Sequence, residues 1–203
     1  MQLFCFDRYG LFITTTPATI TSHGEESGEF TATIPKNTRR IHFIANQNMT
    51  DFQEDEFRNK SEADVIALLE GSSGMMIYWA RFACDANNEE PIDQQLAKSP
   101  NIIMLRNQAK ITIDNPTGNG YLVVTGFTAY NTNAFGTVAP YHPTKGWVWS
   151  SNADVEPFVT LPANDAKLSD IQDVQDISLN PELYVFECEN SSEDPVSVLI
   201  RGH

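Results

Sequence analysis

The stretch "IIMLRNQAKITI" (residues 102–113) decides how the chain is interpreted, because it allows two readings. It begins and ends in aliphatic residues, and between them lie Arg106, Asn107, Gln108 and Lys110. These polar groups could gather around an anion, or they could form the water-facing side of a half-buried strand. Because an extended chain turns successive side chains to opposite faces, position alone can separate the two interpretations.

Sorting the stretch by position favours a strand. One face would carry Ile103, Leu105, Ala109, Ile111 and Ile113. The other face would carry Arg106, Gln108, Lys110 and Thr112. The cations then point away from the predicted core, which argues against a binding site. Asn107 alone breaks the alternation, and we predict that it is hydrogen-bonded inside a sandwich or marks a β-bulge.

The same period of two recurs along the chain and predicts an all-β fold. Further strands are expected at residues 29–34, 41–46, 75–84, 121–130, 184–188 and 196–201. Segments rich in Gly, Pro, Asn, Asp and Ser separate them, as turns require. Helices are expected only at residues 61–71 and 91–100. The first has Ser61 as N-cap and a buried stripe of Val65, Ile66, Leu68 and Leu69. We therefore predict a single antiparallel β-sandwich domain over residues 1–203, with one or two short helices.

Composition limits the classes of partner. The 203 residues are 41% hydrophobic and 20% charged, which is typical of a globular chain. There are 27 acidic residues against 13 basic ones, for a net charge of −14. Such a chain repels phosphate backbones, so we expect no nucleic-acid partner. No apolar stretch has the length of a transmembrane helix. The three cysteines, Cys5, Cys84 and Cys188, are predicted to be buried free thiols.

Sequence signatures of catalysis and of metal binding are missing. The four histidines are scattered: His23, His42, His142 and His203. No zinc, serine-hydrolase or nucleotide-binding motif accompanies them. We therefore predict no catalytic residue, no metal ligand and no cofactor, and a protein that is not an enzyme. A hydrolase acting through paired carboxylates is the most distant alternative. The acidic clusters at residues 51–56 and 170–176 are interpreted as solvated surface rather than calcium sites.

Aromatic residues in "PYHPTKGWVWSS" (residues 140–151) provide the best candidate for a ligand site. Tyr141, Trp147 and Trp149 could stack on sugar rings, and the two tryptophans share a face if the segment is extended. Burial in the core is the more usual environment of tryptophan. Carbohydrate binding is therefore our alternative prediction.

Five short motifs follow one another in the chain: "LFCFDRYGLFI" (3–13), "TRRIHFIANQN" (38–48), "MLRNQAKITI" (104–113), "GFTAYNTNAFGTVAPY" (126–141) and "LYVFECENSSEDPVSVLIRG" (183–202). In this order they resemble the fimbrillin-like proteins of Bacteroidetes, the Mfa-like or fimbrillin-associated family. The third motif is similar to that family's most recognisable strand, here with Arg106, Asn107, Ala109 and Lys110. The fifth looks like the closing hairpin of its amino-terminal domain.

This resemblance implies a transthyretin-like Greek-key sandwich that is exported through a lipoprotein precursor to the outer membrane and cell surface. It implies a structural or adhesion subunit of a fimbrium. Its partners would be other fimbrial subunits, bound by β-strand addition, and glycans or proteins of host or bacterial surfaces. Strand exchange would need an exposed strand edge or open groove near residues 2–15. The chain has no lipobox cysteine and no second domain after His203, so we expect an excised domain or a shortened relative.

Overall fold

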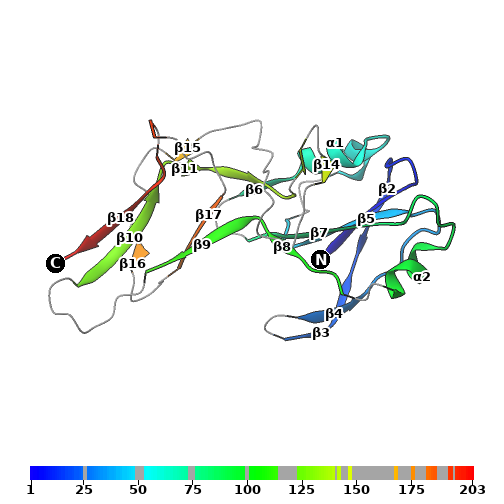
Figure 1. Ribbon diagram of the computed structural model, residues 1–203, viewed down its shortest axis with the longest axis horizontal. Helices are drawn as coiled ribbons and strands as arrows, with labels where there is room; N and C mark the ends of the chain where they lie inside the picture. Colours follow the sequence, from blue (N-terminus) through cyan, green and yellow to red (C-terminus); the bar gives the residue numbers. More distant parts are fainter. Residues whose placement is uncertain are drawn as a thin grey trace. The chain divides into compact units, whose positions relative to one another are not determined.

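In the computed structural model, the regular secondary structure consists mostly of antiparallel strands, which confirms the predicted all-β class (Figure 1). The structure describes residues 1–24, 27–48, 53–72, 76–98, 101–113, 123–139, 141–142, 146–147, 167–168, 175–176, 182–186, 192–193 and 195–203. The chain forms two compact units. Unit 1 comprises Met1–Leu69 and Ile77–Arg106, and unit 2 comprises Glu70–Met76 and Asn107–His203. Compactness does not test whether each unit folds independently, so the single domain over 1–203 stays a prediction.

Unit 1 contains a five-stranded antiparallel sheet with the strand order β2-β1-β5-β7-β8. Its strands are β1 (Gln2–Phe6), β2 (Phe12–Pro17), β5 (Arg40–Ala45), β7 (Tyr78–Ala83) and β8 (Leu105–Arg106). A separate two-stranded hairpin joins β3 (Thr19–His23) to β4 (Gly28–Thr31). The unit also holds the 3-10 helix η1 (Glu54–Phe57) and the helices α1 (Glu62–Ala67) and α2 (Ile92–Ala97).

The two strands β1 and β5 are buried on both faces, which explains why they are apolar at nearly every position. On one face, Leu3 and Cys5 of β1 belong to a hydrophobic cluster that includes Ile92 of α2. On the other face, Phe4 packs edge-on against Phe57 of η1, with ring centroids 5.8 Å apart. Sequence alternation predicted only one buried face for residues 41–46. The structure buries four consecutive residues there, Ile41, His42, Phe43 and Ile44.

The predicted helices are both present. Ser61 is the N-cap of α1, and its hydroxyl and the Asp64 carboxylate form a reciprocal capping box. Val65 and Ile66 are buried as expected. Leu68 is 45% exposed, so its predicted place in the buried stripe is wrong. Leu68 is the C-cap of α1, and Leu69, the next residue, is buried as expected.

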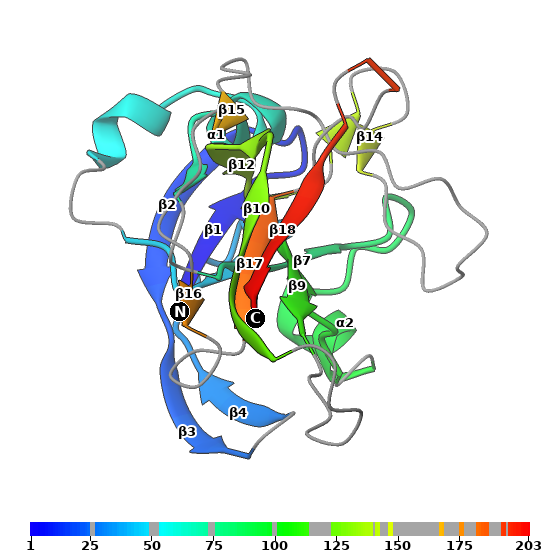
Figure 2. The same cartoon turned by 90° about the vertical axis from the view of Figure 1, so that its left-hand side faces the viewer.

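Unit 2 contains a three-stranded antiparallel sheet, β16-β10-β18, and several two-stranded pairs (Figure 2). The sheet consists of β10 (Val124–Tyr130), β16 (Gln175–Asp176) and β18 (Ser197–Gly202). The pairs are β6 (Glu70–Ser72) with β12 (Phe135–Thr137), β9 (Gln108–Thr112) with β17 (Glu182–Phe186), β11 (Thr132–Asn133) with β15 (Lys167–Leu168), and β13 (Tyr141–His142) with β14 (Gly146–Trp147). The predicted closing hairpin is wrong, because β17 pairs with β9 whereas β18 pairs with β10.

The stretch at residues 102–113 is two strands rather than one. β8 pairs with β7 in unit 1, and β9 pairs with β17 in unit 2. Asn107 lies between them, where the chain passes from one unit to the other. It therefore marks a break in the strand, which is a larger irregularity than the predicted bulge.

The predicted water-facing side of this stretch is correct for Arg106, Lys110 and Thr112, but other positions differ. Arg106 and Lys110 are exposed, as expected. Ile103 is 63% exposed and Ala109 is also exposed, whereas Gln108 is only 7% exposed. The alternation assumed one continuous strand, and the break at Asn107 removes that assumption.

Candidate functional site

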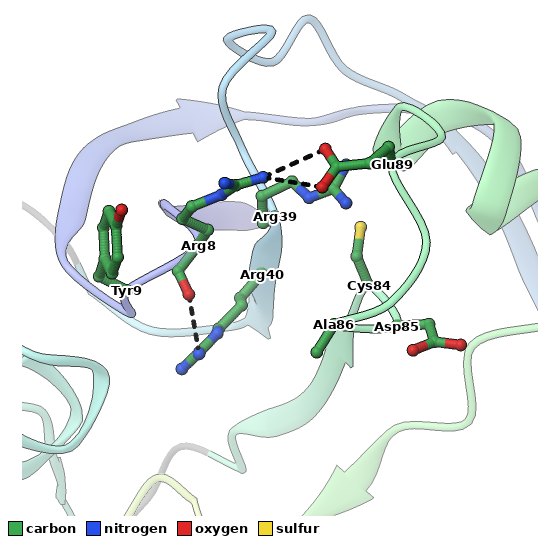
Figure 3. Close-up of a pocket in the computed structure, with 8 residues that line it drawn as sticks. All are labelled: Arg8, Tyr9, Arg39, Arg40, Cys84, Asp85, Ala86 and Glu89. Atoms are coloured by element: carbon green, nitrogen blue, oxygen red, sulfur yellow. Dashed lines mark hydrogen bonds and ion pairs between the residues drawn. The ribbon is translucent and has the colours of Figure 1, made fainter.

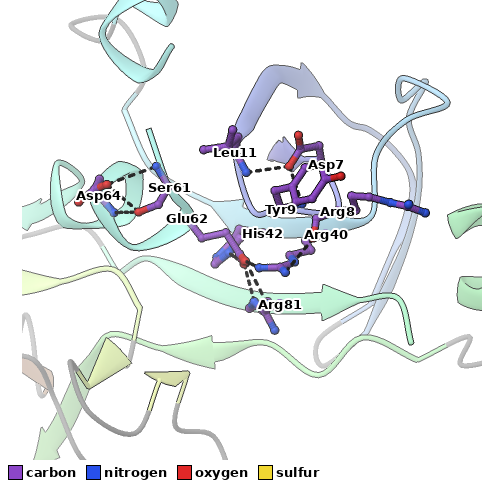
Figure 4. A network of polar contacts seen from close by, with 10 residues as sticks. All are labelled: Asp7, Arg8, Tyr9, Leu11, Arg40, His42, Ser61, Glu62, Asp64 and Arg81. Carbon is purple, nitrogen blue, oxygen red and sulfur yellow. Dashed lines mark hydrogen bonds and ion pairs between the residues drawn. The ribbon is translucent and has the colours of Figure 1, made fainter. Parts of the chain in front are cut away.

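The most enclosed polar cluster of unit 1 surrounds Glu62 at the start of α1 (Figure 4). Its carboxylate accepts hydrogen bonds from Arg40 and His42 of β5 and from Arg81 of β7. The bonds from His42 Nε2 and Arg81 Nε measure 2.8 and 2.6 Å. Two partners lie on β5 and one on β7, so the cluster ties the helix to two neighbouring strands.

The hydrogen bonds fix the tautomer of His42. The indole nitrogen of Trp79 donates to His42 Nδ1 over 3.0 Å, so Nδ1 is an acceptor. Nε2 then carries the proton and donates it to Glu62. The imidazole is 0% exposed, and burial lowers its pKa, which favours this neutral form. The pKa of Glu62 is lowered despite its burial by the three donors that face it, led by His42.

This cluster is suited to holding the fold together. A neutral imidazole with both nitrogens engaged has neither a free lone pair nor a free proton for a substrate. Two guanidinium groups balance one carboxylate, so the buried charge is compensated. We assign the cluster to stability, and the search for a binding site moves to the surface of the unit.

A cavity of about 240 Å³ opens beside this cluster in unit 1 (Figure 3). The turn between β1 and β2, the start of β5 and the loop after β7 line it. Three arginines reach it: Arg8, Arg39 and Arg40. In a chain with only 13 basic residues and a net charge of −14, this is a local concentration of positive charge.

The loop wall of the cavity is held by donors from two sides. The Arg39 guanidinium donates to the carbonyl oxygens of Asn88 and Glu90. The amide of Gln95, on α2, donates to the same two oxygens, at 3.4 and 2.8 Å. Its side-chain oxygen accepts from the amide of Asp85 at 3.0 Å. The wall is therefore fixed before any ligand arrives.

The strand edge near residues 2–15, where strand exchange was expected, is partly occupied. β1 lies between β2 and β5, so its hydrogen bonds are made on both sides. β2 is the edge strand, but the amide of Phe12 donates to the Lys60 carbonyl at 3.0 Å. The amide of Thr15 donates to Glu54 Oε1 at 3.1 Å. Pro17 ends the strand without an amide hydrogen.

β18, at one edge of the three-stranded sheet of unit 2, differs from β2 in its exposure. Within the part of the chain that the structure describes, β18 has β10 as its single strand partner. Three consecutive apolar residues of β18 are exposed: Val198 by 40%, Leu199 by 37% and Ile200 by 54%. Because they alternate between the two faces, both faces of the edge present hydrocarbon to the solvent.

The aromatic residues predicted to bind sugar are described in part. Tyr141 pairs with Trp147 across the short ladder of β13 and β14. Trp149 lies outside the described residues. The structure thus brings two of the three predicted positions together in the backbone.

The remaining predicted residues have separate roles. Lys110 donates to Glu182 Oε1 over 2.8 Å, across the β9–β17 ladder, and this is a surface ion pair. Lys110 and Asn107 belong to unit 2, whereas Arg106 is the last residue of unit 1 before the chain enters unit 2. The side chain of Asn107 lies close to Gly71, where an added Cβ would be 2.4 Å from its Nδ2.

The cysteines and the acidic groups complete the survey. Cys5 is a buried free thiol, and burial raises its pKa to about 11. Cys84 is half-buried and free, and its pKa is raised as well; Cys188 lies outside the described residues. Across the described ranges, no group of three or more His, Cys, Asp or Glu residues is placed to hold a metal ion. No helix in those ranges is long and apolar enough to cross a membrane.

Comparisons with protein-family models, with curated proteins and with solved structures find no match. The site features therefore stand on the geometry alone. Sequence reasoning missed the arginine-lined cavity, because "DRYG" and "TRRIHF" were interpreted only as a turn and a strand. The adjacent Arg39 and Arg40 at the start of a buried strand were the available signal.

Proposed function

We propose that this protein is a non-enzymatic structural or adhesion subunit of a fimbria-like assembly on the cell surface. It contacts partner subunits by β-strand addition. Support for the family, for the transthyretin-like Greek key and for a place at the outer membrane comes from the five sequence motifs. Support for strand addition comes from the exposed apolar edge of β18, which is the observation that carries the proposal.

The edge of β18 has the properties that strand addition requires. An edge strand leaves every second N–H and C=O group without a strand partner, and a partner strand can use them. Proteins that avoid such pairing place lysines or prolines on the edge. β18 has neither, and its one charged residue, Arg201, follows the apolar run. Added pairing there would also cover Val198, Leu199 and Ile200, which are exposed in the single chain.

A substitution pair tests the proposal. Ile200→Lys places a charge on the β18 edge, where Ile200 is 54% exposed. Ile20→Lys makes the same change in the β3–β4 hairpin, where Ile20 is 57% exposed. We expect Ile200→Lys to weaken association of the chain with itself or with co-expressed subunits of its own operon, measured by sedimentation velocity. We expect Ile20→Lys to leave association unchanged.

Hydrogen exchange supplies the second readout. Amides of β18 that do not face β10 should exchange rapidly in the single chain and become protected in the assembly. If both lysine variants weakened association equally, the effect would come from the added charge and not from the position of the residue on β18. An assembly in which β18 remains unprotected would contradict strand addition at this edge.

Carbohydrate binding through Tyr141, Trp147 and Trp149 is the second candidate function. The observation in its favour is the cross-strand pairing of Tyr141 with Trp147. Titration with neutral oligosaccharides while tryptophan fluorescence is recorded tests it. The double variant Trp147→Ala, Trp149→Ala should lose the response, and a wild-type chain without any response would exclude this function.

A further inference from the structure

We propose that the arginine-lined cavity of unit 1 binds the carboxylate and the ring of an acidic sugar. Arg8 and Arg39 would hold the carboxylate, and Tyr9 would pack against the ring. This site is separate from the β18 edge and from the aromatic residues of β13 and β14. The proposal therefore does not depend on strand addition.

Arg39 provides a fixed cation without a carboxylate partner among the described residues. Its guanidinium donates only to the carbonyl oxygens of Asn88 and Glu90. A guanidinium has five N–H donors, so donors remain after these two bonds. Because the carbonyl bonds hold the group in place, little conformational freedom is left to lose when an anion binds.

Arg8 already binds a carboxylate, and that carboxylate is replaceable. Its Nη2 lies 3.3 and 3.2 Å from the two carboxylate oxygens of Glu89. The side chains of Arg8 and Glu89 are 55% and 81% exposed. Exposed pairs of this kind contribute little free energy. The contact with Glu89 therefore shows how Arg8 can bind a carboxylate. The carboxylate of a ligand can displace that of Glu89.

Tyr9 places an aromatic ring at the rim of the same cavity. It is 78% exposed, and Figure 3 shows it on the other side of Arg8 from Glu89. The turn that carries it is rigid, because the amides of Tyr9 and Leu11 donate to Asp7 Oδ1 at 2.8 and 2.9 Å. An exposed aromatic ring beside a cation suits a ligand that has both an apolar ring face and an anionic group.

The other acidic residue of the cavity is engaged elsewhere. Asp85 Oδ1 accepts from the amide of Asn87 at 2.9 Å, which closes the turn after β7. The third arginine, Arg40, donates to Glu62 and to the carbonyl of Arg8. It thus positions the main chain of Arg8 and adds positive potential. The lining residues carry three positive and two negative charges, which is a net positive charge in an otherwise acidic chain.

Calorimetric titration of the whole chain at low salt tests the site with three probes: D-glucuronate, D-glucose and acetate. Glucuronate carries the ring and the carboxylate, glucose only the ring, and acetate only the carboxylate. We expect glucuronate to bind more tightly than either of the others, with an affinity that falls as salt is added. Arg8→Gln should weaken glucuronate binding about tenfold, because a charge-assisted hydrogen bond is lost.

Glu89→Gln gives the sharpest prediction. It removes the internal competitor, so the affinity for glucuronate should rise about two- to fivefold, the value of an exposed ion pair. Asp55→Asn is the matched control. It makes the same change of charge at another exposed arginine pair, Asp55–Arg58, outside the cavity. Its affinity should equal that of the wild type.

Several results would overturn the proposal. Equal binding of glucose and glucuronate would exclude the arginines, and equal binding of acetate and glucuronate would exclude recognition of the ring. An equal gain in Glu89→Gln and Asp55→Asn would show a general effect of net charge. Absence of glucuronate binding would reject the site outright. The variant Ile200→Lys should bind glucuronate normally, which separates this proposal from strand addition.

Discussion

The edge strands β2 and β18 differ in the groups that lie against their outer sides. On β2, a main-chain carbonyl and the Glu54 carboxylate accept from the amides of Phe12 and Thr15. On β18, the described residues offer the edge no second strand, and three apolar side chains are exposed. Edge amides that are hydrogen-bonded within the chain are not available to another chain's strand. An edge with exposed apolar side chains favours such pairing. The comparison therefore supports the proposal that strand addition uses β18.

The two units also differ in how their interiors are fixed. Unit 1 depends on the buried charge of Glu62, which three donors from two strands surround. Unit 2 depends on a close approach of Phe186 to Gly136, where an added Cβ would lie 2.1 Å from the ring. The stability of unit 1 should fall when the buried charge is lost, and that of unit 2 should fall when side-chain volume is added.

Glu62→Ala should have the largest effect on stability. It leaves the buried donors of Arg81 and His42 without their acceptor, and breaking a buried ion pair costs about 3–5 kcal/mol. Urea unfolding would measure the loss. Glu182→Ala is the matched control in unit 2, because it removes an exposed carboxylate bonded to Lys110 and Tyr184. A loss that is no larger in Glu62→Ala than in this control would remove the contrast between the units.

Gly136→Ala should have the next largest effect, and it tests the packing of unit 2. The methyl group would overlap the Phe186 ring, and overpacking of this kind costs about 1–3 kcal/mol. Gly24→Ala is the control, since its nearest neighbour would be an ordinary 3.5 Å away. Thermal unfolding of both variants would show the difference. Equal unfolding temperatures would mean that Phe186 moves aside without cost.

Much of the fold could be predicted from local pattern. The N-cap at Ser61 and the apolar alternation of β10 and β17 are short-range signals, and they identified a helix and two strands. Strand partners are long-range features that local pattern does not encode. The "ENSSEDP" turn predicted a hairpin, yet β17 and β18 pair with β9 and β10. The break at Asn107 was visible as an exception, but its cause, a change of unit, was not.

The candidate sites were harder to predict than the fold. The cavity collects Arg8, Arg39 and Glu89 from segments that lie up to 81 residues apart, so no motif spacing reveals it. The Glu62 cluster is hidden for the same reason, because its four members come from α1, β5 and β7. Exposure of β18 could not be inferred from its alternation, which is typical of a strand with one buried face.

The stability of unit 1 should depend on pH through His42. Its pKa is lowered from the ordinary 6.5 by burial, with Arg81 and Arg40 nearby, although Glu62 opposes the shift. As the pH falls below about 6.5, the unfolded chain binds a proton that the folded chain does not. The free energy of unfolding should then fall by up to about 1.4 kcal/mol per pH unit.

Urea unfolding of the wild type and of His42→Gln between pH 7 and pH 5 isolates this dependence. The variant should lose the slope, because glutamine does not titrate. Below the ordinary pKa of glutamate, 4.5, the lowered pKa of Glu62 adds a loss of the same sign. Parallel slopes in the wild type and in the variant above pH 5 would show that His42 is not the group responsible.

Glu54→Ala should have the smallest effect on stability and the most direct bearing on the two edges. It removes the acceptor of the Thr15 amide and of the Thr14 hydroxyl, at a cost of about 0.5–1.5 kcal/mol. The Thr15 amide should exchange with solvent faster, and β2 should begin to support association of the kind proposed for β18. Glu56→Ala, an exposed change in the same 3-10 helix, is the control. If the Thr15 amide stays protected in Glu54→Ala, the β2 edge is closed by something other than this carboxylate, and the contrast with β18 rests on Lys60 and Pro17 alone.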